Sequence, residues 1–164
     1  MNDGRCTLLL KPIGVIRSPF TEAAGTPIQT VFAADARGCV EIYPEYAEGL
    51  RDLAGFERIW LIYMLDRAPA GKLRVVPFRD DTERGIFATR APCRPNPIGL
   101  SCIRVLAVEG GIISIADVDV LDGTPLLDIK PYVPAFDAFP GIRCGWYEKA
   151  SVNRTRADDR FAVA

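Results

Sequence analysis

Short apolar segments separated by turn residues run through most of the chain. Residues 39–44 (CVEIYP) alternate apolar and polar side chains with period two, which is typical of a half-buried strand. Residues 59–65 (IWLIYML) form the longest clean apolar stretch, which fits a buried strand or a short core helix; we interpret it as a central strand. Gly110 and Gly111 separate two further strand-like segments and predict a hairpin turn. This pattern predicts an antiparallel sheet or barrel.

One segment has a helical pattern instead. Tyr46, Leu50 and Leu53 recur at helical spacing within residues 44–56, and they predict a short helix that ends at Gly55. Every other apolar segment is too short or too strictly alternating to suggest a second helix of similar length.

The length of 164 residues fits one domain. Residues 13–17 and 73–78 add two more predicted strands to the sheet. We therefore predict a mainly β fold, a single antiparallel β-barrel domain with one or two short helices. Residues 1–142 form this domain in the prediction, and residues 143–164 form a peripheral C-terminal arm.

A proline-rich loop, GIFATRAPCRPNPIGLS at residues 85–101, carries the first candidate site. Three prolines within six residues exclude a regular strand and restrict the loop before folding, so little entropy is lost in holding Arg90, Arg94 and Asn96. Arginine can bind carboxylates or phosphates, and asparagine both donates and accepts. The alternative is a rigid connector whose arginines pair with acids elsewhere. Neighbouring cations would lower the pKa of the Cys93 thiol, which makes a nucleophilic role a further alternative.

The segment DVDVLDGTPLLDIKPYVP carries the second candidate site. Asp128, Lys130 and Tyr132 alternate along an extended stretch, so we expect all three on one face. They form either a surface salt-bridge ladder or a polar site. Asp117 and Asp119 lie two residues apart in a predicted strand, so we expect them also to share a face.

The composition narrows the possible chemistry. Histidine is absent, which excludes Ser-His-Asp and Cys-His catalysis and histidine-bound metals. The five cysteines include no C-x-x-C pair, so we expect neither a disulfide framework nor a metal site. The Gly-rich motifs of dinucleotide and NTP sites are missing. Reactions must therefore depend on Asp, Glu, Lys, Arg, Tyr, Cys and backbone groups.

Charge and hydropathy bear on partners and location. The net charge of −1 argues against a strong nonspecific nucleic-acid binder, although residues 85–106 carry three arginines and no acid. No apolar run approaches the ~18 residues that span a bilayer, and the first residues contain no leader pattern. We therefore expect a cytoplasmic protein without a membrane partner.

Four motifs together resemble the TsaA-like family, also called TrmO or YaeB-like. IGVIRSPF, EYAEGLRDLAGF, GIFATRAPCRPNPIGLS and LDGTPLLDIKPY occur in that family's order and spacing, over roughly residues 11–137. The resemblance implies a β-barrel methyltransferase domain that uses S-adenosylmethionine (SAM) and works as a homodimer. It also implies a substrate, tRNA, in which threonylcarbamoyladenosine beside the anticodon is methylated on N6.

The resemblance also implies which residues contact the cofactor. They lie after the first strand, at the end of the central strand, in the proline-rich loop and before the DGTP turn. These residues are Pro27, Ile28, Gln29, Asp66, Arg67, Arg90, Leu100, Ala116, Asp117, Val118 and Asp119. The sequence departs from the family pattern at four places: Ile28 replaces an arginine, the Asp66–Arg67 pair lacks a histidine, Arg58 stands where a histidine is frequent, and Ala91 replaces a serine.

Methyl transfer from a sulfonium needs orientation more than acid–base help, so a chain without histidine can perform it. We hypothesise that Asn96 or Asp128 accepts a hydrogen bond from the adenine amine, that Arg94 and Lys130 hold a carboxylate or phosphate of the substrate, and that Tyr132 stacks on a base. Two alternatives stay open: a SAM-dependent methyltransferase acting on something other than tRNA, and a SAM-binding sensor without catalysis.

Overall fold

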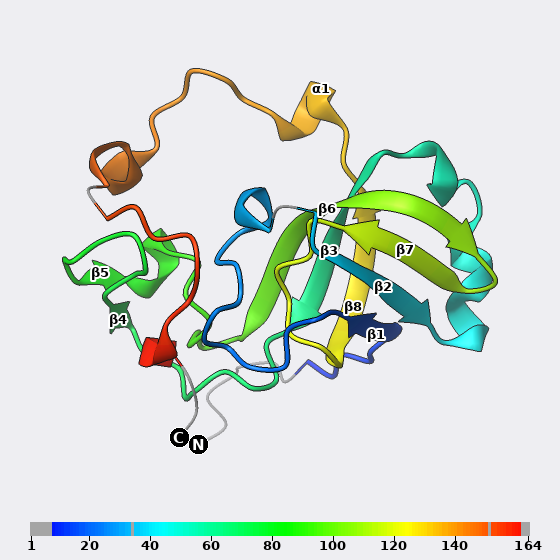
Figure 1. The fold of residues 1–164 in the computed structure, drawn as a ribbon, viewed down its shortest axis with the longest axis horizontal. Coiled ribbons are helices and arrows are strands. Elements are labelled where there is room, and N and C mark those ends of the chain that lie inside the picture. The colour runs from blue at the N-terminus through cyan, green and yellow to red at the C-terminus, as the bar shows by residue number, and fades with distance from the viewer. Residues whose placement is uncertain (1–7, 34, 151, 162–164) are drawn as a thin grey trace.

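Six strands form a closed antiparallel barrel in the computed structural model, which describes residues 8–33, 35–150 and 152–161 (Figure 1). Their order around the barrel is β1-β2-β7-β6-β3-β8, and β8 closes onto β1. The strands are β1 Gly14–Arg17, β2 Arg37–Ile42, β3 Arg58–Met64, β6 Ile98–Glu109, β7 Ile112–Ala116 and β8 Thr124–Pro131, with β4 Arg74–Val75 and β5 Arg84–Gly85 pairing outside the barrel. The predicted mainly β fold with an antiparallel barrel is confirmed.

Alternate side chains of the strands fill the barrel. In β3, Ile59, Leu61 and Tyr63 are buried, whereas the residues between them are half-buried. They pack against inward-facing residues of the neighbouring strands, such as Ile103 of β6. Burying one large apolar side chain stabilises a fold by roughly 1.5–3 kcal/mol. Residues 59–65 therefore supply the predicted central strand and not a core helix.

The hairpin between β6 and β7 turns at Gly110 and Gly111, as predicted. Both residues have a positive φ, 56° and 85°, which glycine adopts without steric cost. Strand β6 is long enough to pair with β3 along one part and with β7 along another. A bulge between Val105 and Ala107 bends it between these two partners, because an extra residue increases the local twist.

The segment predicted as a helix, residues 44–56, forms two 3-10 helices, Pro44–Leu50 and Leu53–Gly55. Between them Asp52 has a φ of 66°, a left-handed conformation through which a right-handed helix cannot continue. The predicted single helix is therefore wrong. Among the described residues the only α-helix is α1, Pro134–Asp137, and the other 3-10 helices are Thr30–Phe32, Ile86–Ala88, Gly145–Lys149 and Asp159–Phe161. None of the helices in this part of the chain has the length and apolar character needed to cross a membrane.

The predicted strand at residues 73–78 is shorter than expected. Only Arg74 and Val75 pair, with Gly85 and Arg84 of β5. Pro77 lacks a backbone donor, so the ladder ends before it.

The C-terminal segment leaves the barrel after α1 and returns beside the small β4–β5 sheet (Figure 1). On its way the Trp146 indole donates to the Ala88 carbonyl at 2.7 Å. Further on, Arg156 forms an antiparallel bridge with Pro27. The first seven residues, residues 34 and 151, and the last three residues of the predicted domain and arm lie outside the described residues.

Candidate functional site

A cavity of about 340 Å³ opens beside the barrel, within the roughly 300–1,000 Å³ typical of small-molecule sites. Its wall comes from five parts of the chain: the loop that includes residues 26–29, the end of β3 with residues 65–68, the proline-rich loop with the start of β6, residues 119–124, and the C-terminal segment near residue 158. These parts are distant in sequence, and closure of the barrel brings them together.

Most residues that the resemblance assigns to a cofactor line this cavity. They are Pro27, Ile28, Gln29, Asp66, Arg67, Arg90, Leu100 and Asp119. The remaining three lie elsewhere: Ala116 and Val118 are buried, and the Asp117 carboxylate contacts Arg58 at 3.0 Å. Arg94, assigned to the substrate, also lines the cavity.

Asp117 and Asp119 do not share a face, so that expectation is wrong. Strand β7 ends at Ala116, and Asp117 has a φ of 65°, which interrupts the alternation of an extended strand. Asp117 pairs with Arg58 and Arg104, whereas Asp119 lines the cavity. The left-handed residue thus directs the second carboxylate toward the site.

Two arginines bring positive charge to the cavity. Arg90 donates to the Gln29 side-chain oxygen at 2.5 Å, which joins two predicted cofactor residues. Arg94 donates to the Thr89 carbonyl at 2.9 Å and the Ile86 carbonyl at 3.2 Å. Within the described chain neither guanidinium makes an ion pair with a carboxylate, so both charges remain available to an anionic group.

The rigid-connector interpretation of the proline-rich loop holds only in part. Arg94 does brace the loop, but through carbonyl groups of the loop itself and not through acids elsewhere. Its guanidinium also lies over the Phe87 ring, 5.9 Å from the centroid. The side chain of Cys93, which belongs to this loop, is fully buried. The thiol is therefore removed from solvent, and its interpretation as a nucleophile has no support.

A chain of hydroxyl groups ends at Asp119. The Ser101 hydroxyl donates to Asp119 Oδ1 at 2.6 Å, so it accepts from the Tyr63 hydroxyl at 2.9 Å. Burial raises the pKa of Asp119 to about 6, although the Ser101 hydrogen bond and the Arg90 charge oppose the shift. Burial likewise raises the pKa of Tyr63, which keeps the phenol protonated as a donor. Asp119 lines the cavity without a direct ion pair to any described side chain, and the Arg90 charge acts on it from beyond salt-bridge distance.

Strand geometry explains this arrangement. Tyr63 lies opposite Gly99, and Leu61 lies opposite Ser101, so Tyr63 and Ser101 project inward from neighbouring strands near the same end of the barrel. Neither residue was predicted from the sequence. The sequence did contain a sign of an inward-facing polar group, because Ser101 is polar and lies two positions before Ile103, on the same buried face of β6.

The other residues proposed for the catalytic step or the substrate are not among those that line the cavity. Lys130 pairs with Asp128 at 2.8 Å, and both side chains are substantially exposed. Tyr132 packs against the edge of Trp60, with 5.6 Å between the ring centroids. Asn96 is exposed at the tip of the proline-rich loop. The expected shared face of Asp128 and Lys130 is observed, in the form of the ion pair that the ladder alternative describes.

A bulge sets the direction of these side chains. The β3–β8 pairing shifts between Ile62 and Tyr63, so Leu126 and Ile129 both face the core although they are an odd number of positions, three, apart. Asp128 consequently faces away from the core. In the described ranges no three Cys, Asp or Glu residues are grouped as metal ligands.

Comparisons with known proteins identify relatives over most of the chain. A protein-family model described as "tRNA-methyltransferase O N-terminal domain" matches residues 15–138. A Pyrococcus abyssi protein named "Probable S-adenosyl-L-methionine-binding protein" is 51% identical over 153 residues, covering 92% of this chain and 83% of the relative. An Archaeoglobus fulgidus protein named "S-adenosyl-L-methionine-binding protein" is 45% identical over 130 residues, covering 79% of this chain and 93% of the relative.

A solved structure extends the comparison to the fold. The crystal structure of TrmO from Pseudomonas aeruginosa matches with a TM-score of 0.73 and 39% identity, over 87% of this chain and 62% of that chain. The chain therefore spans less than two thirds of the length of that structure. The family model covers most of the chain and carries the motifs quoted above, so the resemblance is confirmed and the chain belongs to the tRNA-methyltransferase O (TrmO) N-terminal domain family.

Proposed function

We propose that the protein is a SAM-dependent methyltransferase that methylates N6 of an adenine in tRNA, specifically threonylcarbamoyladenosine next to the anticodon. A mouse relative named "tRNA (adenine(37)-N6)-methyltransferase" supports the reaction; it is 37% identical over 140 residues, which cover 80% of this chain and 32% of the relative. The observation that carries the proposal is the cavity itself, where the family's cofactor positions meet an unpaired cationic side chain and a partly buried acidic one.

The residues present fit SAM. Its methionyl carboxylate needs a cation, and Arg90 has only the neutral Gln29 amide as a partner among the described residues. Its ammonium and ribose hydroxyl groups are hydrogen-bond donors, and the Asp119 carboxylate is an acceptor for one of them. Ile28, Leu100 and Leu121 add apolar surface for the adenine ring. When bound, SAM supplies an electrophilic methyl group on sulfur.

The protein's own task is then to orient the acceptor amine and remove water. A well-oriented pair of reactants can gain on the order of 7–11 kcal/mol of barrier reduction. In the bound complex the amine would take the methyl group from the sulfonium, which would leave as a neutral thioether, and the amine proton would pass to solvent. Arg94, which lines the cavity while keeping its charge, suits an anionic group of the substrate.

Calorimetric titration with SAM, followed by methylation of tRNA that lacks the modification, tests the proposal. Micromolar, stoichiometric binding and transfer of a labelled methyl group to N6 are expected. Absence of SAM binding would refute the cofactor, and binding without transfer to tRNA would favour another acceptor or a sensor.

A further prediction concerns Asn96 and Asp128, the residues proposed to accept a hydrogen bond from the amine that receives the methyl group. Replacing either residue by alanine should lower turnover about tenfold while the Kd for SAM stays within twofold, because both lie outside the cavity and the lost hydrogen bond concerns only the acceptor amine. Single-turnover methylation assays and calorimetry measure the two quantities. Normal turnover in both variants would exclude this role for either residue.

The net charge of −1 favours a second candidate, a SAM-dependent methyltransferase acting on a small molecule or a protein. The two candidates differ in their salt dependence. If tRNA is the substrate, its affinity should fall more than about tenfold between 50 and 200 mM salt, because a few phosphate contacts release counterions. Filter-binding or fluorescence titrations measure this slope, and a flat or absent dependence would favour the second candidate.

We also propose that the enzyme acts in the cytoplasm, where tRNA is modified, and that it works as a homodimer. The family resemblance supports the dimer. Light scattering of the purified protein at several concentrations tests it, and a monomer mass at all concentrations would reject it.

A further inference from the structure

The C-terminal segment forms part of the cavity wall, although it lies beyond residue 138, where the match to the family model ends. Ala157, Asp158 and Phe161 all line the cavity. Nothing in the local sequence points to this location, because the segment is polar, short in regular structure and distant in sequence from the barrel strands.

Backbone hydrogen bonds join this segment to the loop that carries Pro27, Ile28 and Gln29. Gly25 N–H donates to the Ala157 carbonyl at 2.9 Å, and Ala157 N–H donates to the Thr26 carbonyl at 2.8 Å. Ile28 N–H donates to the Thr155 carbonyl at 3.1 Å. The segment thus runs antiparallel beside the loop, around the isolated bridge between Pro27 and Arg156, and restricts the loop's backbone.

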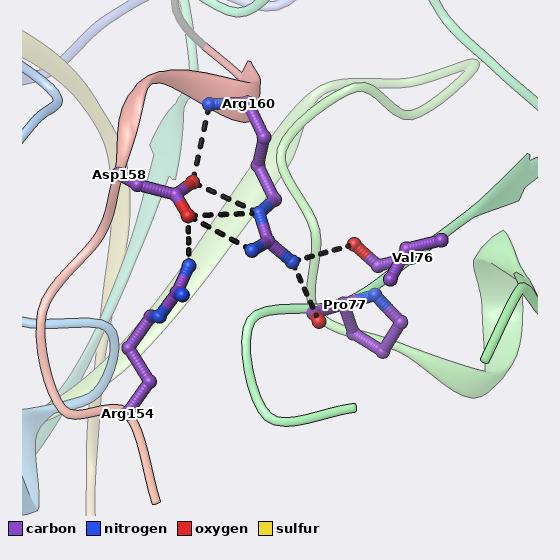
Figure 2. A network of polar contacts seen from close by, with 5 residues as sticks. All are labelled: Val76, Pro77, Arg154, Asp158 and Arg160. Carbon is purple, nitrogen blue, oxygen red and sulfur yellow. Dashed lines mark hydrogen bonds and ion pairs between the residues drawn. The ribbon is translucent and has the colours of Figure 1, made fainter. Parts of the chain in front are cut away.

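An ion cluster fixes the same segment on its other side. Figure 2 shows the Asp158 carboxylate between Arg154 and Arg160, with Arg160 Nη2 at 2.8 Å. Arg160 Nη1 also donates to the Pro77 carbonyl at 3.0 Å (Figure 2), which ties the segment to the residues after β4. Both Asp158 oxygens are occupied by these arginines, so the carboxylate organises the wall and does not itself face a ligand as a free acceptor.

Phe161 provides an apolar anchor. Its side chain is 8% exposed and packs with Val75, Ile86, Ala91 and Cys93 in a cluster separate from the barrel core. It also meets the Phe78 ring edge-on at 5.0 Å. Two members of the cluster, Ala91 and Cys93, belong to the proline-rich loop and lie between Arg90 and Arg94. Phe161 therefore holds that loop as well as the segment's own end.

We propose that residues 154–161 are a component of the SAM site, in which Phe161 and Asp158 are positioning residues that hold the loops of Gln29 and Arg90 in a binding geometry. The proposal rests on the proposed function for the identity of the ligand. It follows from the three attachments described above, since the segment contacts both the loop that carries Gln29 and the loop that carries Arg90.

Hydrogen exchange of the wild-type protein, with and without saturating SAM, tests the proposal without any substitution. Bound SAM should slow exchange of the Gly25, Ile28 and Ala157 amides, which make the loop–segment hydrogen bonds, by at least about tenfold. Unchanged exchange at all three amides under saturation would overturn the proposal.

Substitutions give a second readout. Phe161→Ala should raise the Kd for SAM at least fivefold and speed exchange of the Ala157 amide, while β3 amides keep their protection because the Phe161 cluster is separate from the barrel core. Phe161→Leu should restore most of the affinity. Phe136→Ala, which removes a 64% exposed phenylalanine of α1, serves as the matched control and should leave the Kd unchanged.

A matched acidic pair completes the test. Asp158→Asn should raise the Kd for SAM about threefold, whereas Asp159→Asn, an exposed neighbour, should not. Wild-type affinity in both Phe161→Ala and Asp158→Asn would overturn this inference alone and leave the proposed function intact. Failure of the wild-type protein to bind SAM would instead overturn the proposed function, and this inference with it.

Discussion

Replacing Asp119 with asparagine is expected to stabilise the cofactor-free protein and to weaken SAM binding. The pKa of Asp119 is raised by burial from 3.8 to about 6, so ionising this carboxyl at neutral pH opposes folding. A shift of this size corresponds to a free energy on the order of 3 kcal/mol, or roughly 6–12 °C in Tm. A neutral amide avoids that cost, and thermal unfolding at pH 7.5 measures the gain.

The same substitution should raise the Kd for SAM about 10- to 100-fold, the usual effect of removing one hydrogen bond to a charged group. Asp52→Asn is the matched control, because it makes the same change at a carboxylate that is 91% exposed. Both Tm and Kd should be unaffected there. A loss of stability in Asp119→Asn, or an unchanged Kd, would contradict a role for Asp119 as an unpaired site carboxylate.

The pH dependence has a definite sign. Because the folded-state pKa of Asp119 lies above its unfolded value, the stability that this group contributes is fully present below pH 3.8 and is lost as the pH rises through about 6. The affinity for SAM should change in the opposite direction, increasing from pH 5 to pH 7 as the carboxylate ionises. Tyr63 stays protonated over this range, because burial raises its pKa above the usual value. Calorimetry at several pH values checks the trend, which Asp119→Asn should abolish.

The barrel was predictable because its strands carry local signals. The alternation in residues 39–44 and the glycine pair Gly110–Gly111 each reflect geometry that any short strand or hairpin requires. The errors occur where one residue adopts an uncommon backbone conformation. Asp52 and Asp117 both have positive φ, and each interrupts the periodicity on which the prediction depended.

The candidate site was predictable to the extent that motifs mark it. Gln29, Arg90 and Asp119 came from the resemblance and line one cavity, although their roles stay predictions. Ser101 was missed because a single serine in a strand looks like ordinary alternation. The C-terminal wall was missed for a different reason: pairing between residues 25–28 and 155–157 depends on long-range contacts that leave no pattern in either segment.

A substitution at Gly99 is expected to lower both the stability of the fold and the affinity for SAM. A Cβ atom at this position would lie 2.5 Å from Cζ of Tyr63, inside van der Waals contact, so the ring would have to move. The ring has little room, since Tyr63 is 6% exposed and its hydroxyl is bonded to Ser101. Gly99→Ala should therefore destabilise the fold by about 1–3 kcal/mol, as overpacking of a core does, and denaturant unfolding measures it.

The effect on binding should exceed the effect on stability. Displacing Tyr63 removes the donor that orients Ser101, and Ser101 in turn holds Asp119, so the Kd for SAM should rise more than tenfold. Gly49→Ala is the control, because the added methyl group meets nothing within 4 Å. Adding Tyr63→Leu to Gly99→Ala should recover part of the stability by relieving the clash, but not the affinity, because the hydroxyl chain stays broken. Recovery of both together would mean that the Tyr63 hydroxyl has no part in the site and that Gly99 matters only for packing.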